Sequence, residues 1–284
     1  MTRSAVQLQF QLNCRLSTLD RHPIRLGDLI VMDLDGKALP ETVVWGSAPE
    51  QRVQDLICVG MGADRYYHAP MNIDGWIPSK DTWRCVLAID PSGRGSDQMA
   101  WNVIAELNGN FFLLECGGTT RGYEKDVLEM LAKIAKKWNV TQVVTESNMG
   151  DGMFTALLQP AMLRHHPVAI EEVRVSIQKE RRIVDTLAPL IQQHRLVVSR
   201  SVIKSDYASA ERDPENGHQR SLMYGMSRIT TDRGSLLFDD KIDSLSLGVK
   251  FFVDAAAQDQ QRRKFERQEE LDELMRQAWF DETG

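Results

Sequence analysis

Between Trp83 and about residue 257, the chain alternates short apolar runs with longer segments whose apolar residues recur every three or four positions. Short runs bounded by turn-forming residues are typical of buried strands, and the longer spacing is typical of amphipathic helices. The expected strands are WRCVLAID, QMAWNVIAEL, FFLLECGG, VTQVVTE, IEEVRVS and RLVVS. The expected helices are YEKDVLEMLAKIAKKWN, GMFTALLQPAM, IQKERRIVDTLAPLIQQ and FDDKIDSLSLGVKFFVDAAA.

The order of these elements predicts the fold class. The first three strands follow one another, and NGN between the second and third predicts a tight antiparallel turn. The later strands alternate with helices, which favours parallel pairing through crossover connections. We therefore expect an α/β domain with one mixed β-sheet, antiparallel at its start and then parallel, flanked by helices on both faces. The polar stretch from Ser205 to about Arg220 is expected to be a mobile loop.

The same patterns divide the chain into three parts. Residues 1–78 hold few long apolar elements, and we expect them to be a linker without an independent core. Residues 79–257 carry the alternating pattern and form the expected core domain. Residues 258–284 are highly charged and are expected to form a solvated helical tail.

Composition and charge narrow the function. The 284 residues include 34 Lys and Arg against 40 Asp and Glu, a net charge of −6. This balance argues against a generally basic nucleic-acid binder, although a DNA enzyme whose acidic site binds metal ions stays possible. No apolar run is long enough for a membrane span, and the N-terminus lacks a secretory h-region. The widely spaced cysteines favour reduced thiols in a cytoplasmic protein: Cys14, Cys58, Cys85 and Cys116.

Acidic residues stand at distinctive places in the expected fold. Asp90 ends the first buried strand, and Glu146 ends the strand VTQVVTE. Asp239, Asp240 and Asp243 begin the last helix, where Asp240 and Asp243 share one face. Charged groups at the ends of apolar strands are usually paired or bound to a metal, and ligand sites lie beyond the carboxyl ends of parallel strands.

Convergence of these acids would define a metal centre. Like charges raise one another's pKa, and hard divalent cations relieve the repulsion. Oxygen ligands favour Mg²⁺ or Mn²⁺, and two such ions serve phosphodiester hydrolysis. Taken singly, Asp90 also fits a turn former, Glu146 an ion-pair partner and Asp239 a helix-dipole acid.

A basic segment opposes the overall negative charge. Residues 174–204 hold seven Lys and Arg against two acids. Lys179 and Arg182 share a helix face, where they would bind DNA phosphates near the metals. The candidate DNA-binding residues are Lys179, Arg181, Arg182, Arg94 and Arg121, and Lys241 would offset the charge of the acidic motif. Each of these cations also fits a solvated surface.

With these residues, the chain resembles the nuclease domain of the large terminase subunit (DNA maturase B) of tailed phages. The resemblance covers about Trp83 to Asp254, in the segments AIDPSGRGSD, ECGGTTRGY, VVTESNMGDGMF, SIQKERRIVDTLAPLIQQHRLVV and FDDKIDSLSLGV. It implies an RNase H-like fold related to RuvC-type resolvases. It also implies Mg²⁺-dependent endonucleolytic cutting of concatemeric DNA, with the family's metal-binding acids at Asp90, Glu146 and the Asp240/Asp243 pair.

One feature departs from the family. A complete large terminase carries an ATPase, whereas this sequence has no G-x-x-x-x-G-K-[ST] motif. Residues 1–78 resemble the end of the ATPase domain and its linker, so we expect a shortened chain or a split reading frame without ATP hydrolysis. The resemblance further implies double-stranded DNA, portal protein and small terminase subunit as partners, and the host-cell cytoplasm as the location.

Two alternatives stay open at this stage. A RuvC-like junction resolvase or a transposase-type nuclease would use the same fold and acids, although the sequence lacks a basic N-terminal DNA-binding module. A non-catalytic packaging adaptor would bind portal or small terminase through its tail, although all the acids are present.

Overall fold

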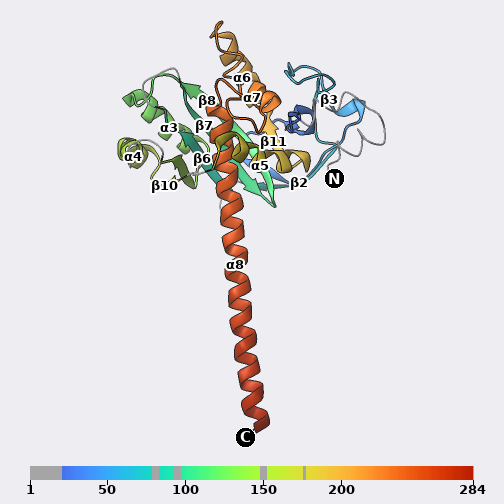
Figure 1. Cartoon of the computed structure of the whole chain (residues 1–284), viewed down its shortest axis with the longest axis vertical. Helices are drawn as coiled ribbons and strands as arrows, with labels where there is room; N and C mark the ends of the chain where they lie inside the picture. The colour runs from blue at the N-terminus through green and yellow to red at the C-terminus, as the bar shows by residue number, and fades with distance from the viewer. Residues whose placement is uncertain (1–20, 79–82, 93–96, 148–151, 175–176, 284) are drawn as a thin grey trace. The chain divides into compact units, whose positions relative to one another are not determined.

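The computed structural model describes residues 21–78, 83–92, 97–147, 152–174 and 177–283, with side chains as far as residue 269. The chain divides into two compact units, residues 1–249 and 250–284, which are described separately. Figure 1 shows the course of the chain through its strands and helices. No described helix is long and apolar enough to cross a lipid bilayer.

A nine-stranded sheet forms the centre of the first unit (Figure 1). Its strands, in spatial order, are β10 (Ala169–Val173), β9 (Gln142–Glu146), β6 (Arg84–Asp90), β7 (Met99–Leu107), β8 (Asn110–Thr119), β11 (Leu196–Ser199), β1 (Ile30–Met32), β4 (Tyr67–His68) and β3 (Arg52–Val53). β6, β7 and β8 pair antiparallel, whereas β10, β9 and β6 pair parallel, as do β8, β11 and β1. The predicted mixed sheet is confirmed.

The predicted hairpin joins β7 to β8. Asn108 and Gly109 both have positive φ, of 52° and 76°, which a two-residue type I′ turn requires. Asparagine and glycine adopt this conformation at low cost, so the NGN sequence fixes the register of the two strands. A separate two-stranded antiparallel sheet consists of β2 (Ala38–Val44) and β5 (Asn72–Pro78).

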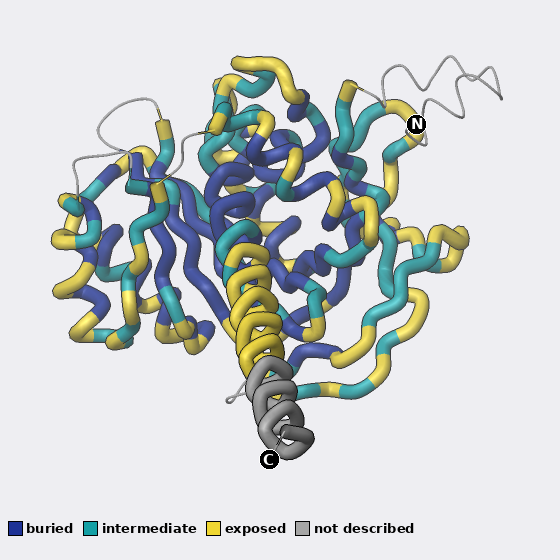
Figure 2. The backbone as a smooth tube through the Cα atoms, turned by 60° about the horizontal axis from the view of Figure 1, so that its bottom comes forward, coloured by how far each residue is buried: buried dark blue, intermediate teal, exposed yellow. Residues whose placement is uncertain are grey.

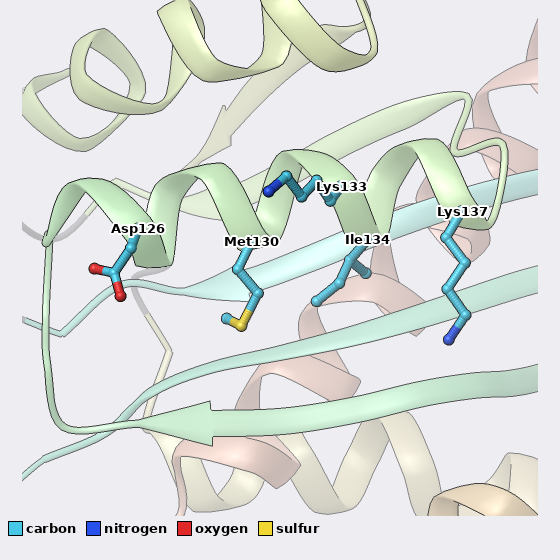
Figure 3. A pocket seen from close by; sticks show the side chains of 5 residues that line it. All are labelled: Asp126, Met130, Lys133, Ile134 and Lys137. Atoms are coloured by element: carbon cyan, nitrogen blue, oxygen red, sulfur yellow. The ribbon is translucent and has the colours of Figure 1, made fainter.

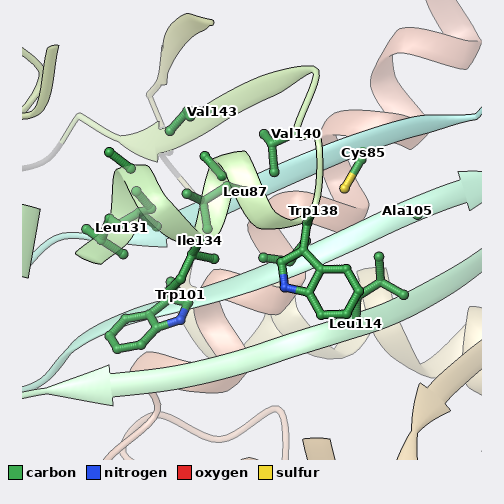
Figure 4. Close-up of a cluster of buried hydrophobic side chains, with 14 of the residues drawn as sticks. Cys85, Leu87, Trp101, Ala105, Leu114, Leu131, Ile134, Trp138, Val140 and Val143 are labelled. Carbon is green, nitrogen blue, oxygen red and sulfur yellow. The ribbon is translucent and has the colours of Figure 1, made fainter. Parts of the chain in front are cut away.

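Helices α3 (Lys125–Lys137) and α4 (Met153–His165) supply apolar residues to a core on one face of the sheet. Figure 4 shows Leu131 and Ile134 of α3 beside Leu87 and Trp101 of the sheet, and Trp138 next to them. Figure 2 shows that the central strands are buried along most of their length. This packing follows directly from the apolar spacing that predicted α3.

The opposite face of the sheet receives the first turns of α8 (Asp240–Thr283). Gly248 permits this approach, because a Cβ atom there would lie 2.5 Å from Ile104 Cδ1 and 2.9 Å from Ala88 Cβ. Asn102, fully buried on β7, donates hydrogen bonds to Lys241 O at 2.8 Å and to Ser244 Oγ. The helix is therefore held against the sheet by both apolar and polar contacts.

The remaining helices of the first unit include one correction. α5 (Lys179–Gln192) agrees with the prediction, but α6 (Arg200–Glu211) and α7 (Leu222–Arg228) were not predicted. The expected mobile loop from Ser205 to Arg220 is wrong in its first part, which is the second half of α6. Asp206 caused the error, because it occupies a buried position that an apolar residue normally fills.

The predicted domain boundary at residue 78 is not tested by the structure. The main sheet does, however, include strands from before residue 78. β1 pairs in parallel with β11, and β4 pairs with β1, so residues before 78 extend the same sheet. The 3₁₀ helices η1 (Leu26–Asp28) and η2 (Pro49–Gln51) connect this region. The described cysteines are free, and burial raises the pKa of the Cys58 thiol to about 11 and that of Cys116 to about 12.

Candidate metal and active centre

The first two predicted acids lie at one edge of the main sheet. β6 and β9 are parallel neighbours, and Ile89 of β6 pairs with Thr145 of β9. The residues that follow, Asp90 and Glu146, therefore end their strands side by side. Glu146 is 8% exposed, and the Asp90 side chain is 16% exposed. The sheet thus presents two largely buried carboxylates beyond the carboxyl ends of its parallel strands.

The start of α8 brings its acids to the same place through contacts with α5. Asp243 is the innermost of them, at 1% exposure. Asp239 precedes the helix, and its carbonyl accepts the Asp243 N–H at 2.8 Å. Asp240 accepts a 3.2 Å hydrogen bond from the Gln98 backbone N–H, which holds it beside the strand β7.

Lys179, the first residue of α5, lies among three of these carboxylates. Its Nζ is 2.8 Å from Asp239 Oδ1, 3.0 Å from Asp243 Oδ2 and 3.9 Å from Asp90 Oδ2. Burial alone would lower the pKa of Lys179, but Asp243, Asp239 and Asp90 outweigh it and raise the pKa above the ordinary lysine value. The ammonium group therefore stays charged and occupies a position that suits a cation.

Arg182 lies one helical turn further along α5 and is buried. Its Nη2 is 2.6 Å from Asp243 Oδ1 and 3.8 Å from Glu146 Oε1. Its Nε and Nη1 have no hydrogen-bond partner among the described residues. The predicted pairing of Lys179 and Arg182 on one helix face is correct, but burial argues against a surface contact with DNA for Arg182, whose guanidinium orients two carboxylates.

The carboxylates repel one another, as the sequence suggested. Burial first, and then Asp243, raise the pKa of Asp90 well above its usual range, with further contributions from Glu146 and Asp240. Burial also raises the pKa of Asp243 to about 6, although Lys179 and Arg182 counteract it. The pKa of Asp240 is raised by burial as well. Such crowding favours a site that binds additional positive charge.

The donor set fits a hard divalent cation. The four linked acids Asp90, Glu146, Asp239 and Asp243 offer only oxygen atoms, which suit Mg²⁺ or Mn²⁺. Among the residues that the structure describes, no three His, Cys, Asp or Glu side chains stand in a metal-ligand arrangement. The Lys179 ammonium lies among these carboxylates, at 2.8 Å from Asp239, 3.0 Å from Asp243 and 3.9 Å from Asp90.

Lys241 forms a different interaction from the one predicted from the sequence. It does not offset the charge of its acidic neighbours, because its Nζ lies 2.7 Å from Asp206 Oδ1 in the buried interior. Asp206 also accepts hydrogen bonds from Ser221 Oγ and from the backbone N–H groups of Leu222 and Met223 at the start of α7. This network, which sequence patterns did not reveal, ties the acidic turn of α8 to α6 and α7.

Two other predicted DNA-binding residues, Arg181 and Arg121, form ion pairs with acids outside the predicted site. Arg181 points outward and pairs with Asp185 at 3.6 Å. Arg121 is exposed and forms ion pairs with Glu124 and with Asp126, the latter at 2.6 Å. Arg94 lies outside the described residues. A residue missed by sequence reasoning is Tyr123, whose pKa is raised by burial and by the nearby charge of Asp90.

A hollow of about 330 Å³ lies along α3 and is lined by Asp126, Met130, Lys133, Ile134 and Lys137 (Figure 3). All five side chains come from this one helix, as Figure 3 shows. Lys137 is engaged there, with its Nζ 2.6 Å from Glu115 Oε2. The hollow contains none of the predicted site residues, so we do not assign the chemistry to it.

Comparison with known proteins places this architecture in a class. Residues 89–196 match the family described as Terminase Bacteriophage T7, Ribonuclease H-like domain. This match spans the strands and helices from the end of β6 to the start of β11, and together with the mixed sheet it identifies an RNase H-like domain. Residues 89–196 therefore belong to the terminase RNase H-like family, and the resemblance and fold class predicted from the sequence are confirmed.

Among curated proteins, the chain is similar to the large terminase subunit of Enterobacteria phage T3. It is 40% identical over 253 residues, which cover 88% of this chain and 42% of that protein. The chain thus spans about two fifths of the length of this relative.

Solved structures show more distant similarity. The large terminase nuclease from thermophilic phage G20c has 12% identity and a TM-score of 0.44, covering 80% of this chain and 96% of that chain. The human cytomegalovirus terminase nuclease domain, Mn soaked and inhibitor bound, has 9% identity and a TM-score of 0.43, covering 60% and 84%. The assignment to the family rests on the sequence matches and not on these structures.

Proposed function

We propose that this chain is the metal-dependent DNA endonuclease of a phage genome-packaging terminase and cuts concatemeric double-stranded DNA. The observation that carries the proposal is the convergence of Asp90, Glu146 and Asp243 around Lys179 and Arg182, in a domain of the terminase RNase H-like family. A buried group of carboxylates whose pKa values are raised is suited to binding divalent cations. Divalent cations bound there would supply the positive charge at the DNA site that the overall composition, with a net charge of −6, lacks.

Asp90, Glu146 and Asp243 are the residues proposed to hold Mg²⁺ or Mn²⁺, with Asp240 and Asp239 completing the set. When bound, two such ions would activate water and stabilise the leaving 3′ oxygen of a phosphodiester. Arg182 keeps Asp243 oriented through the 2.6 Å ion pair. Lys179, whose side chain is 37% exposed, would release the carboxylates to the metal and bind a DNA phosphate at the rim of the site.

The test is cleavage of supercoiled plasmid DNA by the purified chain with Mn²⁺ or Mg²⁺. Asp90→Asn and Glu146→Gln each remove one carboxylate and are expected to reduce nicking at least about 100-fold. Asp185→Asn, an exposed acid on α5, serves as the matched control and is expected to cut at the wild-type rate. Metal-dependent cutting that persists in both Asp90→Asn and Glu146→Gln would exclude the proposed centre.

The wider assembly is part of the same proposal. The T3 relative is a terminase large subunit, and we infer that this chain likewise acts with a portal protein and a small terminase subunit in the cytoplasm of an infected host. Co-purification of the chain with its cognate portal, compared with a chain ending at residue 257, tests whether the charged tail mediates docking. Equal capture of both forms would remove the tail from this part of the proposal.

A further inference from the structure

Two strongly exposed apolar side chains stand close in the sequence to residues of the carboxylate cluster. This cluster consists of Asp90, Glu146, Asp239 and Asp243, which are linked by Lys179 and Arg182. Ile177 is 60% exposed and Leu237 is 73% exposed. Ile177 precedes Lys179 by two residues and Leu237 precedes Asp239 by two, and the 2.8 Å ion pair joins Lys179 to Asp239. Because residues two apart have Cα atoms no more than about 7 Å apart, both apolar residues lie in the segments next to Lys179 and Asp239. The side chains of Lys179 and Asp239, 37% and 22% exposed, form the rim of the cluster.

The loop that carries Leu237 is fixed against α5. The Gln178 side chain donates a 3.1 Å hydrogen bond to Thr231 O, and the Gly234 N–H donates a 2.6 Å hydrogen bond to Glu180 Oε1. These two contacts stand on either side of Lys179. Gly234 has a φ of +70°, which allows the turn at the loop tip. The two hydrogen bonds therefore hold this loop against the start of α5.

The same loop carries a cation that is not used within the described part of the chain. Arg233 is exposed and makes no ion pair with another described residue. Lys179, Arg182 and Arg121, by contrast, are engaged with acids in the described conformation. Arg233 is thus available to a ligand without first breaking an ion pair.

We propose that Ile177, Leu237 and Arg233 form a lip that positions double-stranded DNA over the carboxylate cluster. The apolar side chains contact deoxyribose and base edges, and Arg233 contacts a backbone phosphate. A protein bound over this rim would block access to the carboxylates, so nucleic acid is the occupant that agrees with the neighbouring centre. This inference rests on the proposed function and adds substrate-positioning residues to it.

The experiment measures binding of a labelled DNA duplex of about 20 base pairs by fluorescence anisotropy, in the uncleaving Asp90→Asn background with Mg²⁺, at low and high KCl. The Ile177→Ser/Leu237→Ser variant is expected to lose at least about fivefold in affinity at both salt concentrations, because apolar contacts are not screened. Arg233→Gln is expected to lose a similar factor at low salt and much less at high salt. The controls are Leu163→Ser, 61% exposed on α4, and Lys37→Gln, which is exposed before β2.

The proposal would be overturned if the lip variants bound DNA as tightly as the two control variants do. This holds whether the controls keep the affinity of the Asp90→Asn background or lose the same factor as the lip variants. Thermal melting verifies that these surface substitutions leave the fold intact. Plasmid cutting by the wild-type chain is measured in parallel. If the wild type cuts DNA while the lip variants bind normally, the lip is wrong and the endonuclease stands. If the wild type does not cut, the endonuclease is wrong, whereas the binding results still decide the lip.

Discussion

The ammonium group of Lys241 lies 2.7 Å from a carboxylate oxygen of Asp206, in the interior of the domain. Asp206 is at the same time the acceptor for Ser221 Oγ and for two backbone N–H groups at the start of α7. Lys241, which lies between the predicted metal-binding residues Asp240 and Asp243 in the sequence, therefore anchors the helical turn that carries them. Loss of this anchor should affect both stability and the position of the acids.

Removing one partner of this buried pair leaves the other charge without compensation. Lys241→Met is expected to lower the free energy of unfolding by about 3–5 kcal/mol, measured by urea denaturation. Asp206→Ala is expected to cost more than Lys241→Met, because three hydrogen bonds to α7 are lost as well. Lys250→Gln breaks an exposed ion pair with Asp254 and is expected to cost less than about 1 kcal/mol. A Lys241→Met variant as stable as Lys250→Gln would contradict the anchoring role.

The close approach of α8 to the sheet predicts an asymmetric response of two helical glycines. Gly248→Ala places a Cβ atom against Ile104 and Ala88, at distances that require rearrangement, and is expected to cost about 1–3 kcal/mol of stability. Gly225→Ala on α7 meets its neighbours at 3.7 Å or more and is expected to be neutral or mildly stabilising. Thermal and urea unfolding of both variants provide the comparison. Equal changes in stability for the two substitutions would show that α8 can accommodate a Cβ atom at Gly248 without cost.

Burial of Asp243 predicts a pH-dependent stability in the absence of metal. An unfolded aspartate has a pKa of about 3.9, whereas that of folded Asp243 is raised to about 6. Between these values the folded protein retains a proton that the unfolded chain has released. The stabilisation from protonated Asp243 is therefore greatest below about pH 4 and is lost as the pH rises through about 6.

Asp243→Asn removes this titration. The difference in unfolding free energy, wild type minus Asp243→Asn, is expected to fall by on the order of 3 kcal/mol between about pH 4 and pH 7. Asp185→Asn, an exposed substitution on α5, accounts for general effects of pH and lost charge. A difference that is constant with pH would mean that Asp243 titrates normally.

The position of Lys179 predicts competition with metal ions. Its ammonium lies within 3.0 Å of Asp239 and Asp243, so it occupies space and charge that a divalent cation would need. Lys179→Met is expected to bind Mn²⁺ at least about tenfold more tightly than the wild type, as measured by calorimetry at neutral pH. Arg181→Met, an exposed change on the same helix, should leave affinity unaltered. Weaker Mn²⁺ binding by Lys179→Met would show that Lys179 supports the ligands instead of competing.

The sequence predicted those parts of the fold in which one periodicity governs a whole element. The strand leading to Asp90, the turn at Asn108 and helix α3 follow directly from such local patterns. β1 was missed, because three residues are too few to show a period and their pairing with β11 spans most of the chain. α6 was missed because its buried face includes Asp206, whose partner Lys241 lies 35 residues further along the chain.

The candidate site was predictable to a similar extent. Strand ends and helical spacing placed Asp90, Glu146 and Asp243 together, since these rules depend on local geometry. Whether a charged face of a helix is buried depends on which elements pack against it, and the local sequence pattern does not predict those elements. For that reason Arg182 was predicted to contact DNA, although its guanidinium lies in the interior beside Asp243.

Under the proposed function, the carboxylate cluster binds the divalent cations that are used for cutting DNA. Anomalous diffraction from a crystal of the chain soaked in Mn²⁺ tests this most directly. We predict anomalous peaks bounded by Asp90, Glu146 and Asp243, with the Lys179 ammonium displaced from its present position. A well-ordered site with no anomalous peak, and with Lys179 still bridging Asp239 and Asp243, would show that these carboxylates are not the metal site.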